Sequence, residues 1–180
     1  MTDERSSPES LVPHPAFEEV FDAHFGYVWN TLRRLGVGEA DAQDQAQEVF
    51  VVVSSLLGDY DPARPLRPWL FGIAYRIACR FRALARHRRE LAMDAPPDAA
   101  DPRPAADEEL AAHEARDLVL RALDTIDLDR RAVLVMNLLD EQPMPEVAGA
   151  LGISVNTAYS RLRLAREDFE KAVKRLRRRP

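Results

Sequence analysis

The chain has 180 residues, of which 46% are hydrophobic and 31% are charged, and its formal net charge is −5. This length allows one folded domain or two small ones, and the many Leu, Ala, Arg and Glu residues favour helix over sheet. The polar N-terminus has no signal-peptide pattern, and no apolar run is long enough to span a membrane. We therefore expect a soluble, cytoplasmic, helical protein.

The sequence contains no pattern typical of catalytic or metal-binding chemistry. Its one cysteine, Cys79, excludes an internal disulfide, and its four histidines lack the paired spacing of metal ligands. We find no catalytic triad signature, no glycine-rich phosphate loop and no paired-carboxylate motif. These observations predict no cofactor and no metal, but they do not by themselves exclude an enzyme, because a catalytic site can assemble from residues that are distant in the sequence.

In chain order, the first elements are a polar N-terminus and two amphipathic helices. Residues 1–13 contain several Ser and Pro residues, which predicts disorder. Apolar residues then recur at helical spacing from Pro15 to Leu35, and again from Glu39 to Leu57. The second helix also carries acidic and amide side chains that lie mostly off its apolar stripe. They are either ordinary solvated residues or a contact face for a protein partner. Four of them are Asp41, Asp44, Gln47 and Glu48.

A loop and a third helix follow. Gly58–Pro65 has the composition of a loop, and Pro68 fits the first turn of a helix whose apolar stripe begins at Trp69. From Arg76 to Arg89 this helix carries six arginines and no acid. Three helices, each with a regular apolar stripe, predict a compact helical domain over residues 14–90.

The second half of the chain begins with a linker. Residues 91–106 are rich in Pro, Ala and Asp, which predicts a flexible acidic tether. Helices are then predicted from Asp107 to Leu123 and, after a cap at Asp127 or Asp129, on to Leu139. The predicted fold class is therefore all-α. Two small helical domains, residues 14–90 and 107–178, flank the linker.

The stretch from Pro143 to Arg166 has the layout of a DNA-binding helix-turn-helix. Pro145 suits the first turn of a helix, Gly152 can end that helix in the left-handed conformation, and Ser154 can cap the next one. The second helix has a polar face with no acid before Glu167. Two helices that only pack together do not require a polar face without acids. A helix that faces phosphates and base edges does require one. The residues expected to contact duplex DNA are Ser154, Val155, Asn156, Thr157, Tyr159, Ser160, Arg161, Arg163 and Arg166.

The charges are segregated along the chain. Nine basic residues and three acids lie between Arg161 and Arg179, while eight acids and two arginines lie between Leu91 and Asp117. With the arginines that follow Arg76, this pattern places an acidic segment between two basic blocks. Each block alone could be a solvated helix face. Together they favour two nucleic-acid contacts joined by a tether.

Three motifs, in this order, resemble those of the extracytoplasmic-function (ECF) sigma factors, the two-domain class of bacterial RNA polymerase specificity subunits. Asp41–Phe50 is similar to the family's acidic helix, Pro68–Ala74 to its W-L-x-x-I-A helix, and Leu151–Arg166 to its recognition helix. The resemblance spans about Phe17 to Leu176. Within it, Arg76 and Arg80 stand where the family often has Asn and Asp.

The resemblance implies a role for each surface. The helix with Asp41, Asp44, Gln47 and Glu48 would bind the clamp helices of the polymerase β′ subunit. The Ser154–Arg166 helix would enter the minus-35 promoter element, and its domain would contact the β flap. The minus-10 element would be bound by Tyr60, Arg64, Arg67, Trp69, Arg76 and Arg80.

The partners implied are core RNA polymerase, promoter DNA and an anti-sigma factor, which in this family is often membrane-anchored. One alternative is a sigma-like helix-turn-helix regulator that binds duplex DNA without polymerase. A third hypothesis, from another class, is a helical enzyme or adaptor with an incidental basic tail. The first two hypotheses differ in what they expect of the acidic helix, since only a sigma factor, which resembles this chain, needs it for polymerase.

Overall fold

The computed structural model describes residues 15–91 and 107–178, and these residues form helices joined by short turns. The predictions for residues 1–13 and for the linker from residue 92 to 106 lie outside this part of the chain. The N-terminal domain consists of α1 (Phe17–Arg34), α2 (Glu39–Leu56), the 3-10 turn η1 (Leu57–Asp59) and α3 (Leu66–Leu91). The C-terminal domain consists of α4 (Asp107–Asp124), α5 (Leu128–Leu134), η2 (Val135–Leu139), α6 (Met144–Leu151) and α7 (Val155–Arg177).

The N-terminal domain is built as the apolar periodicity predicts. The stripe of α2 faces the core, and Ala42, Val49 and Val53 are fully buried. Phe50 of the same stripe packs edge-on against Phe21 of α1, with ring centroids 4.8 Å apart. Because α1, α2 and α3 each contact the other two, the three helices share one core.

The helix that begins with α5 differs from the prediction at its end. Asp127 caps it, because its side chain accepts a hydrogen bond from the Asp129 N–H at 3.1 Å. Helical periodicity predicts that the apolar side chains of Leu138 and Leu139 are buried, but they are 45% and 44% exposed, so that prediction is wrong. The cause is the π-helical geometry of η2, in which the Asp140 N–H bonds to the Val135 carbonyl five residues back. This wider turn moves later side chains off the 3.6-residue period.

Helix α7 is longer than its basic composition suggests. The helix continues through the basic segment that begins at Lys171 and ends only at Arg177. Ala172 is buried, and α7 packs along both α4 and α5. Tertiary packing on its apolar face therefore keeps this charged segment helical.

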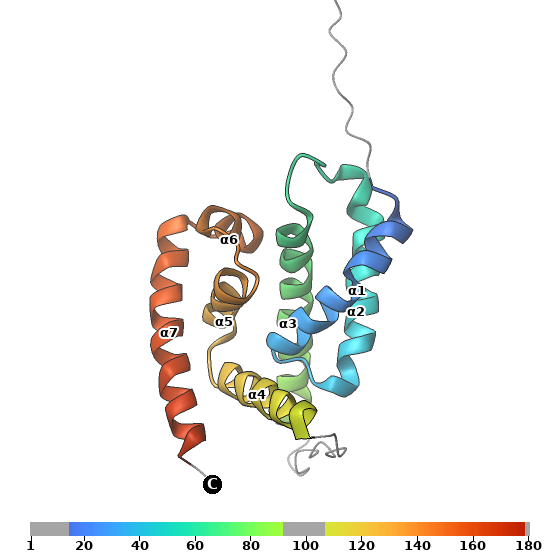
Figure 1. Ribbon diagram of the computed structural model, residues 1–180. Coiled ribbons are helices and arrows are strands. Elements are labelled where there is room, and N and C mark those ends of the chain that lie inside the picture. The colour runs from blue at the N-terminus through green and yellow to red at the C-terminus, as the bar shows by residue number, and fades with distance from the viewer. Residues whose placement is uncertain (1–14, 92–106, 179–180) are drawn as a thin grey trace, which may run out of the picture.

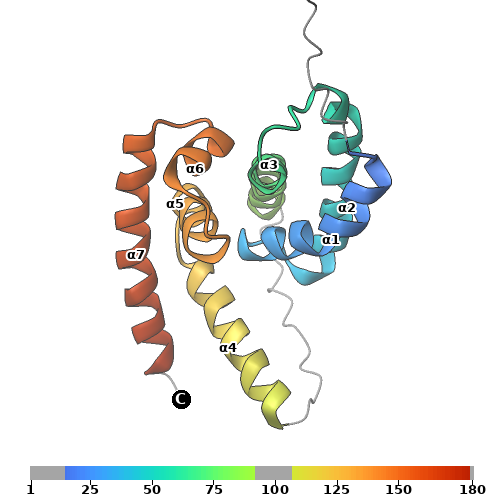
Figure 2. The same cartoon turned by 45° about the horizontal axis from the view of Figure 1, so that its top comes forward.

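The two domains pack directly against each other. Helix α3 lies between the α1–α2 pair and the C-terminal helices, with α7 on the far side of α5 and α6 (Figures 1 and 2). Contacts between α3 and α6 and between α1 and α4 join the domains. One cluster of buried residues runs without a break from Val20 in α1 to Ala165 in α7. The predicted two-domain fold is thus present in a closed arrangement.

Candidate nucleic-acid interface

The turn between α6 and α7 has the geometry that its sequence predicts. Gly152 ends α6 in the left-handed region, with φ of +66°. Ser154 caps α7, because its Oγ accepts a hydrogen bond from the Thr157 N–H at 3.1 Å. Ala158 and Leu162 are buried against the rest of the domain, which fixes the rotation of α7 about its own axis. The first turns of α7 therefore present a defined face to solvent.

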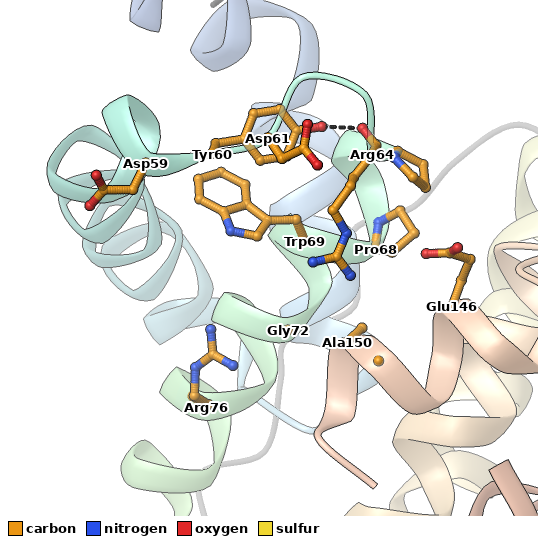
Figure 3. Close-up of a pocket in the computed structure, with 12 residues that line it drawn as sticks. Asp59, Tyr60, Asp61, Arg64, Pro68, Trp69, Gly72, Arg76, Glu146 and Ala150 are labelled. Atoms are coloured by element: carbon orange, nitrogen blue, oxygen red, sulfur yellow. Dashed lines mark hydrogen bonds between the residues drawn. The ribbon is translucent and has the colours of Figure 1, made fainter. Parts of the chain in front are cut away.

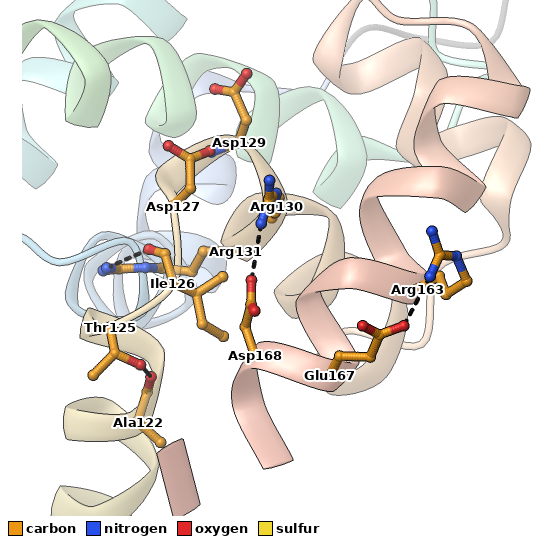
Figure 4. A network of polar contacts seen from close by, with 10 residues as sticks. All are labelled: Ala122, Thr125, Ile126, Asp127, Asp129, Arg130, Arg131, Arg163, Glu167 and Asp168. Carbon is orange, nitrogen blue, oxygen red and sulfur yellow. Dashed lines mark hydrogen bonds and ion pairs between the residues drawn. The ribbon is translucent and has the colours of Figure 1, made fainter. Parts of the chain in front are cut away.

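That outward face contains the residues predicted to bind duplex DNA. Val155 and Tyr159 are 39% and 56% exposed, which is high for side chains of their size. Arg161 is different, since its Nη2 lies 2.6 Å from Asp129 Oδ2 and its side chain is only 27% exposed. The remaining predicted residues are exposed, namely Ser154, Asn156, Thr157, Ser160, Arg163 and Arg166. Arg163 bonds one helical turn along to Glu167, at 2.8 Å (Figure 4).

A second polar site lies where the η1–α3 loop meets the start of α3. The rings of Tyr60 and Trp69 are in contact, with centroids 4.8 Å apart and planes tilted by 44°. The Tyr60 hydroxyl donates a hydrogen bond to the Arg64 carbonyl, which closes the loop over the rings (Figure 3). Arg64 and Arg76 line the same cavity of about 210 Å³. Tyr60 is only 6% exposed and supports the half-buried Trp69 ring. One aromatic surface beside two guanidinium groups suits an unstacked base and its phosphate.

A third surface is the acidic side of α2. Asp41, Asp44 and Gln47 are exposed, and Glu48 is half-buried because it pairs with Arg80 of α3. Val51 continues this face and is 67% exposed. An apolar side chain beside acids and amides is typical of a protein-binding surface rather than a nucleic-acid-binding one.

Comparison with known proteins shows the family. Residues 20–90 match the family "Sigma-70 region 2", and residues 116–169 match "Sigma-70, region 4". The sigma factor CarQ of Myxococcus xanthus is 33% identical over 157 residues, which cover 87% of this chain and 86% of CarQ. The sigma factor CnrH of Cupriavidus metallidurans is 29% identical over 84% of this chain and 83% of its own.

The chain belongs to the ECF family of RNA polymerase sigma factors. Its structure resembles that of CnrH in complex with the cytosolic domain of CnrY, with a TM-score of 0.64 and 28% identity. That match covers 88% of this chain and 87% of CnrH. The fold is also shared with the sigma factor RpoE of Bartonella quintana in complex with the anti-sigma factor NepR, at a TM-score of 0.67 and 18% identity.

The residues expected to bind the minus-10 element do not all meet in this sigma factor. Tyr60, Arg64, Trp69 and Arg76 line one cavity, as described above. The guanidinium of Arg67 instead lies over the ring of Tyr27, 5.3 Å from its centroid. Arg80 lies with Glu48 on the acidic side of α2. Arg67 and Arg80, which the resemblance groups with the other minus-10 residues, therefore lie outside this cavity.

Sequence reasoning missed two carboxylates that join the domains. Asp140 accepts a hydrogen bond from the Tyr27 hydroxyl at 2.8 Å and pairs with Arg34 at 3.1 Å. Asp129 accepts one from the Tyr75 hydroxyl at 2.6 Å. Burial raises the pKa of Asp140, and the same cause raises the pKa of Tyr75. No local pattern could have revealed these contacts, since the paired residues lie far apart in the chain.

Within residues 15–91 and 107–178, no three His, Cys, Asp or Glu side chains are placed to hold a metal ion. The helices of this same part of the chain include none with the length and apolarity to cross a bilayer. Burial raises the pKa of the Cys79 thiol, which disfavours the reactive thiolate.

Proposed function

We propose that this sigma factor binds core RNA polymerase through the acidic side of α2 and reads a promoter at two separate sites. The N-terminal domain, residues 14–90, corresponds to region 2, and residues 107–178 correspond to region 4. The protein gives the polymerase sequence selectivity and catalyses no reaction itself. The observation that carries this proposal is that three differently built polar surfaces lie on α2, at the start of α3 and on α7.

The contact with polymerase is assigned to Asp41, Asp44, Gln47 and Glu48, extended by Val51. Two of the carboxylates, Asp44 and Glu48, are four residues apart and so share one side of the helix. Exposed Val51 adds an apolar centre of the kind that specific protein interfaces bury. This composition supports a protein partner, and the β′ clamp helices are the partner that the family implies.

The minus-10 contact is assigned first to the cavity at the start of α3. Its Trp69 ring, supported from behind by buried Tyr60, offers a stacking surface for an unstacked base, and Arg64 and Arg76 offer charge for the backbone. Arg67 remains a candidate for the phosphates outside the cavity. For Arg80 the pairing with Glu48 supports a role on the polymerase-binding surface instead.

The minus-35 contact is assigned to the exposed face at the N-terminal end of α7. In a helix-turn-helix the second helix enters the major groove with its N-terminal residues at the base edges. Val155, Asn156 and Tyr159 are then placed for bases. Ser154, Thr157, Ser160, Arg161, Arg163 and Arg166 are placed for bases or phosphates.

An anti-sigma factor completes the proposed set of partners. The support is the likeness to CnrH, whose structure contains the cytosolic domain of CnrY. A partner of that class would hold this sigma factor in the cytoplasm, at the membrane if the partner is anchored there. Binding of a cytosolic domain requires no membrane-spanning segment in the sigma factor itself.

Run-off transcription by core polymerase, with and without the chain, tests the proposal. Replacing Asp44 and Glu48 by arginine should abolish run-off product and co-purification with core polymerase. The fold should survive, because the side chains of Arg80 and Glu48 are 55% and 42% exposed and ion pairs at such sites contribute about 0–1 kcal/mol. The matched control replaces Glu18 and Asp22 by arginine, which makes the same charge change at the same spacing on an exposed part of α1.

Two outcomes would contradict the assignment. If the Asp44/Glu48 variant still binds core polymerase as the control does, α2 is not the contact. If the unaltered chain binds duplex DNA but never supports run-off, the protein is a DNA-binding regulator that acts without polymerase.

A further inference from the structure

Two large apolar side chains face water at the start of α7. Val155 is 39% exposed and Tyr159 is 56% exposed. They are four residues apart, so they lie on one side of the helix. Figures 1 and 2 show α7 at the outer edge of the molecule, on the far side of α5 and α6 from the N-terminal domain. Neighbouring exposed apolar side chains, unlike single ones, mark a surface that contacts something else.

The position of this pair indicates DNA as the partner. In a helix-turn-helix the N-terminal residues of the second helix lie at the base edges, and Val155 is the first residue of α7. Three arginines follow before the first acid of the helix, Glu167. An apolar pair beside basic charge complements duplex DNA. The backbone of the duplex is anionic, and its major groove contains one apolar group, the C5-methyl group of thymine.

The side chains at this end of α7 are those that recognise A·T pairs. In the major groove guanine is bound by Arg or Lys, cytosine by Asp or Glu, adenine by Asn or Gln, and thymine by apolar groups. The first six residues of α7, 155–160, include no charged residue. This segment therefore lacks the groups that select guanine and cytosine. It offers Asn156 for adenine and the apolar pair for thymine.

Most of the small hydroxyl groups nearby are occupied by the helix cap. Ser154 Oγ accepts a hydrogen bond from the Thr157 N–H at 3.1 Å and lies 2.8 Å from Thr157 Oγ1. Among the serine and threonine residues of 154–160, only Ser160 stands outside this cap. The large side chains that project from the first two turns are therefore those of the apolar pair.

The spacing of the pair matches the spacing of bases along one strand. Cβ atoms four residues apart on a helix are about 5–6 Å from each other. Successive bases of one strand are about 3.4 Å apart along the axis of B-form DNA. The pair therefore spans between one and two base steps. Two thymines that are adjacent, or separated by one base, would place one methyl group against each side chain.

We propose that Val155 and Tyr159 recognise thymine in the minus-35 element by contact with its C5-methyl group, while Asn156 binds adenine. This inference rests on the proposed function, because it takes α7 to be the helix that enters the minus-35 element. It adds the chemical group that the helix recognises there. The competing assignment is a bond from the Tyr159 hydroxyl to a phosphate, which would be independent of base sequence.

Deoxyuridine tests the contact directly, because it lacks only the C5-methyl group of thymidine and keeps its base pairing. Duplexes randomised over both promoter elements are first selected for binding to holoenzyme made from core polymerase and the full chain. Thymine should be enriched at one or two neighbouring positions of the upstream element. Replacing each of these thymines by deoxyuridine should then weaken holoenzyme binding about 4-fold per methyl group, the factor expected when one such group is no longer buried.

Three variants assign each methyl group to a side chain. Val155→Ala and Tyr159→Ala should each remove the effect of deoxyuridine at one position and retain it at the other. Both should fold, because the positions are exposed and alanine favours helix. Tyr159→Phe keeps the ring and should keep the effect, whereas uniformly weaker binding to every sequence would assign the tyrosine to a phosphate instead. The matched control is Leu84→Ala in α3, which truncates another exposed apolar side chain and should respond to deoxyuridine as the unaltered chain does.

The inference is overturned if deoxyuridine has no effect at the selected thymines, or if its effect persists undiminished in both alanine variants. A selected upstream element without thymine overturns it as well. Each of these results leaves the sigma-factor assignment standing, because a holoenzyme has formed and has selected a promoter. If instead no upstream element is selected, α7 does not bind the minus-35 element, and the proposed function fails together with this inference.

Discussion

Replacing Arg161 by alanine should separate the stability of the fold from its affinity for DNA. In the free chain the substitution removes one ion pair with Asp129, at 2.6 Å, between side chains that are 27% and 45% exposed. Such pairs contribute about 0–1 kcal/mol. For a chain of this size 1 kcal/mol corresponds to roughly 2–4 °C in Tm, so the melting temperature should fall by no more than about 4 °C. Asp129 keeps its hydrogen bond from Tyr75 and is not left without a partner.

The effect on promoter binding should be larger. Arg161 lies in the second turn of α7, within reach of the major groove when the N-terminal end of that helix enters it. Loss of a bidentate base contact lowers affinity by about 1–3 kcal/mol, which is roughly 5- to 150-fold. Loss of a phosphate contact alone would weaken all sequences alike and reduce the slope of log affinity against log salt by about 1.

The assay is promoter binding by the holoenzyme at several salt concentrations. Lys174→Ala is the matched control. It removes one positive charge from the same helix, about 20 Å further along, where the ammonium lies 3.9 Å from Glu170. If Arg161→Ala and Lys174→Ala bind promoter equally well at every salt concentration, Arg161 does not contact DNA. A fall in Tm far beyond 4 °C would show that the arginine serves mainly the fold.

Three further predictions concern stability and ionisation. In chemical denaturation, Arg131→Ala should lower the free energy of unfolding by about 2–4 kcal/mol and Asp124→Ala by less than about 1 kcal/mol, because the arginine is fully buried whereas its partner is 59% exposed. In the same assay Gly152→Ala should lower the free energy of unfolding by about 1–2 kcal/mol. The cause is the backbone φ of +66° alone, because a Cβ added at Gly152 would contact no other atom within 4 Å. Burial raises the pKa of Tyr27 and Tyr75 above the ordinary value near 10. Their hydroxyl groups should therefore stabilise the fold fully below about pH 10, and this stabilisation should be lost as pH rises further. Tyrosinate absorbance measures the ionisation directly.

Local sequence signals predicted the helices well, because each of these signals depends only on residues a few positions apart. The Asp127 and Ser154 caps, the left-handed Gly152 and the stripe of α2 all appear in the structure as expected. The exposed face at the start of α7 followed from the same stripe, because burial of Ala158 and Leu162 fixes which side faces water. These features need no knowledge of what the helix packs against.

Features that depend on distant partners could not be predicted in this way. Arg80 falls on the arginine-rich side of α3 in sequence, but its position beside Glu48 depends on how α2 and α3 cross. The exposure of Leu139 depends on the π-helical turn, and the spacing of apolar residues does not predict such a turn. Tyr75 and Asp129 are 54 residues apart, and only the packing of the two domains brings them together.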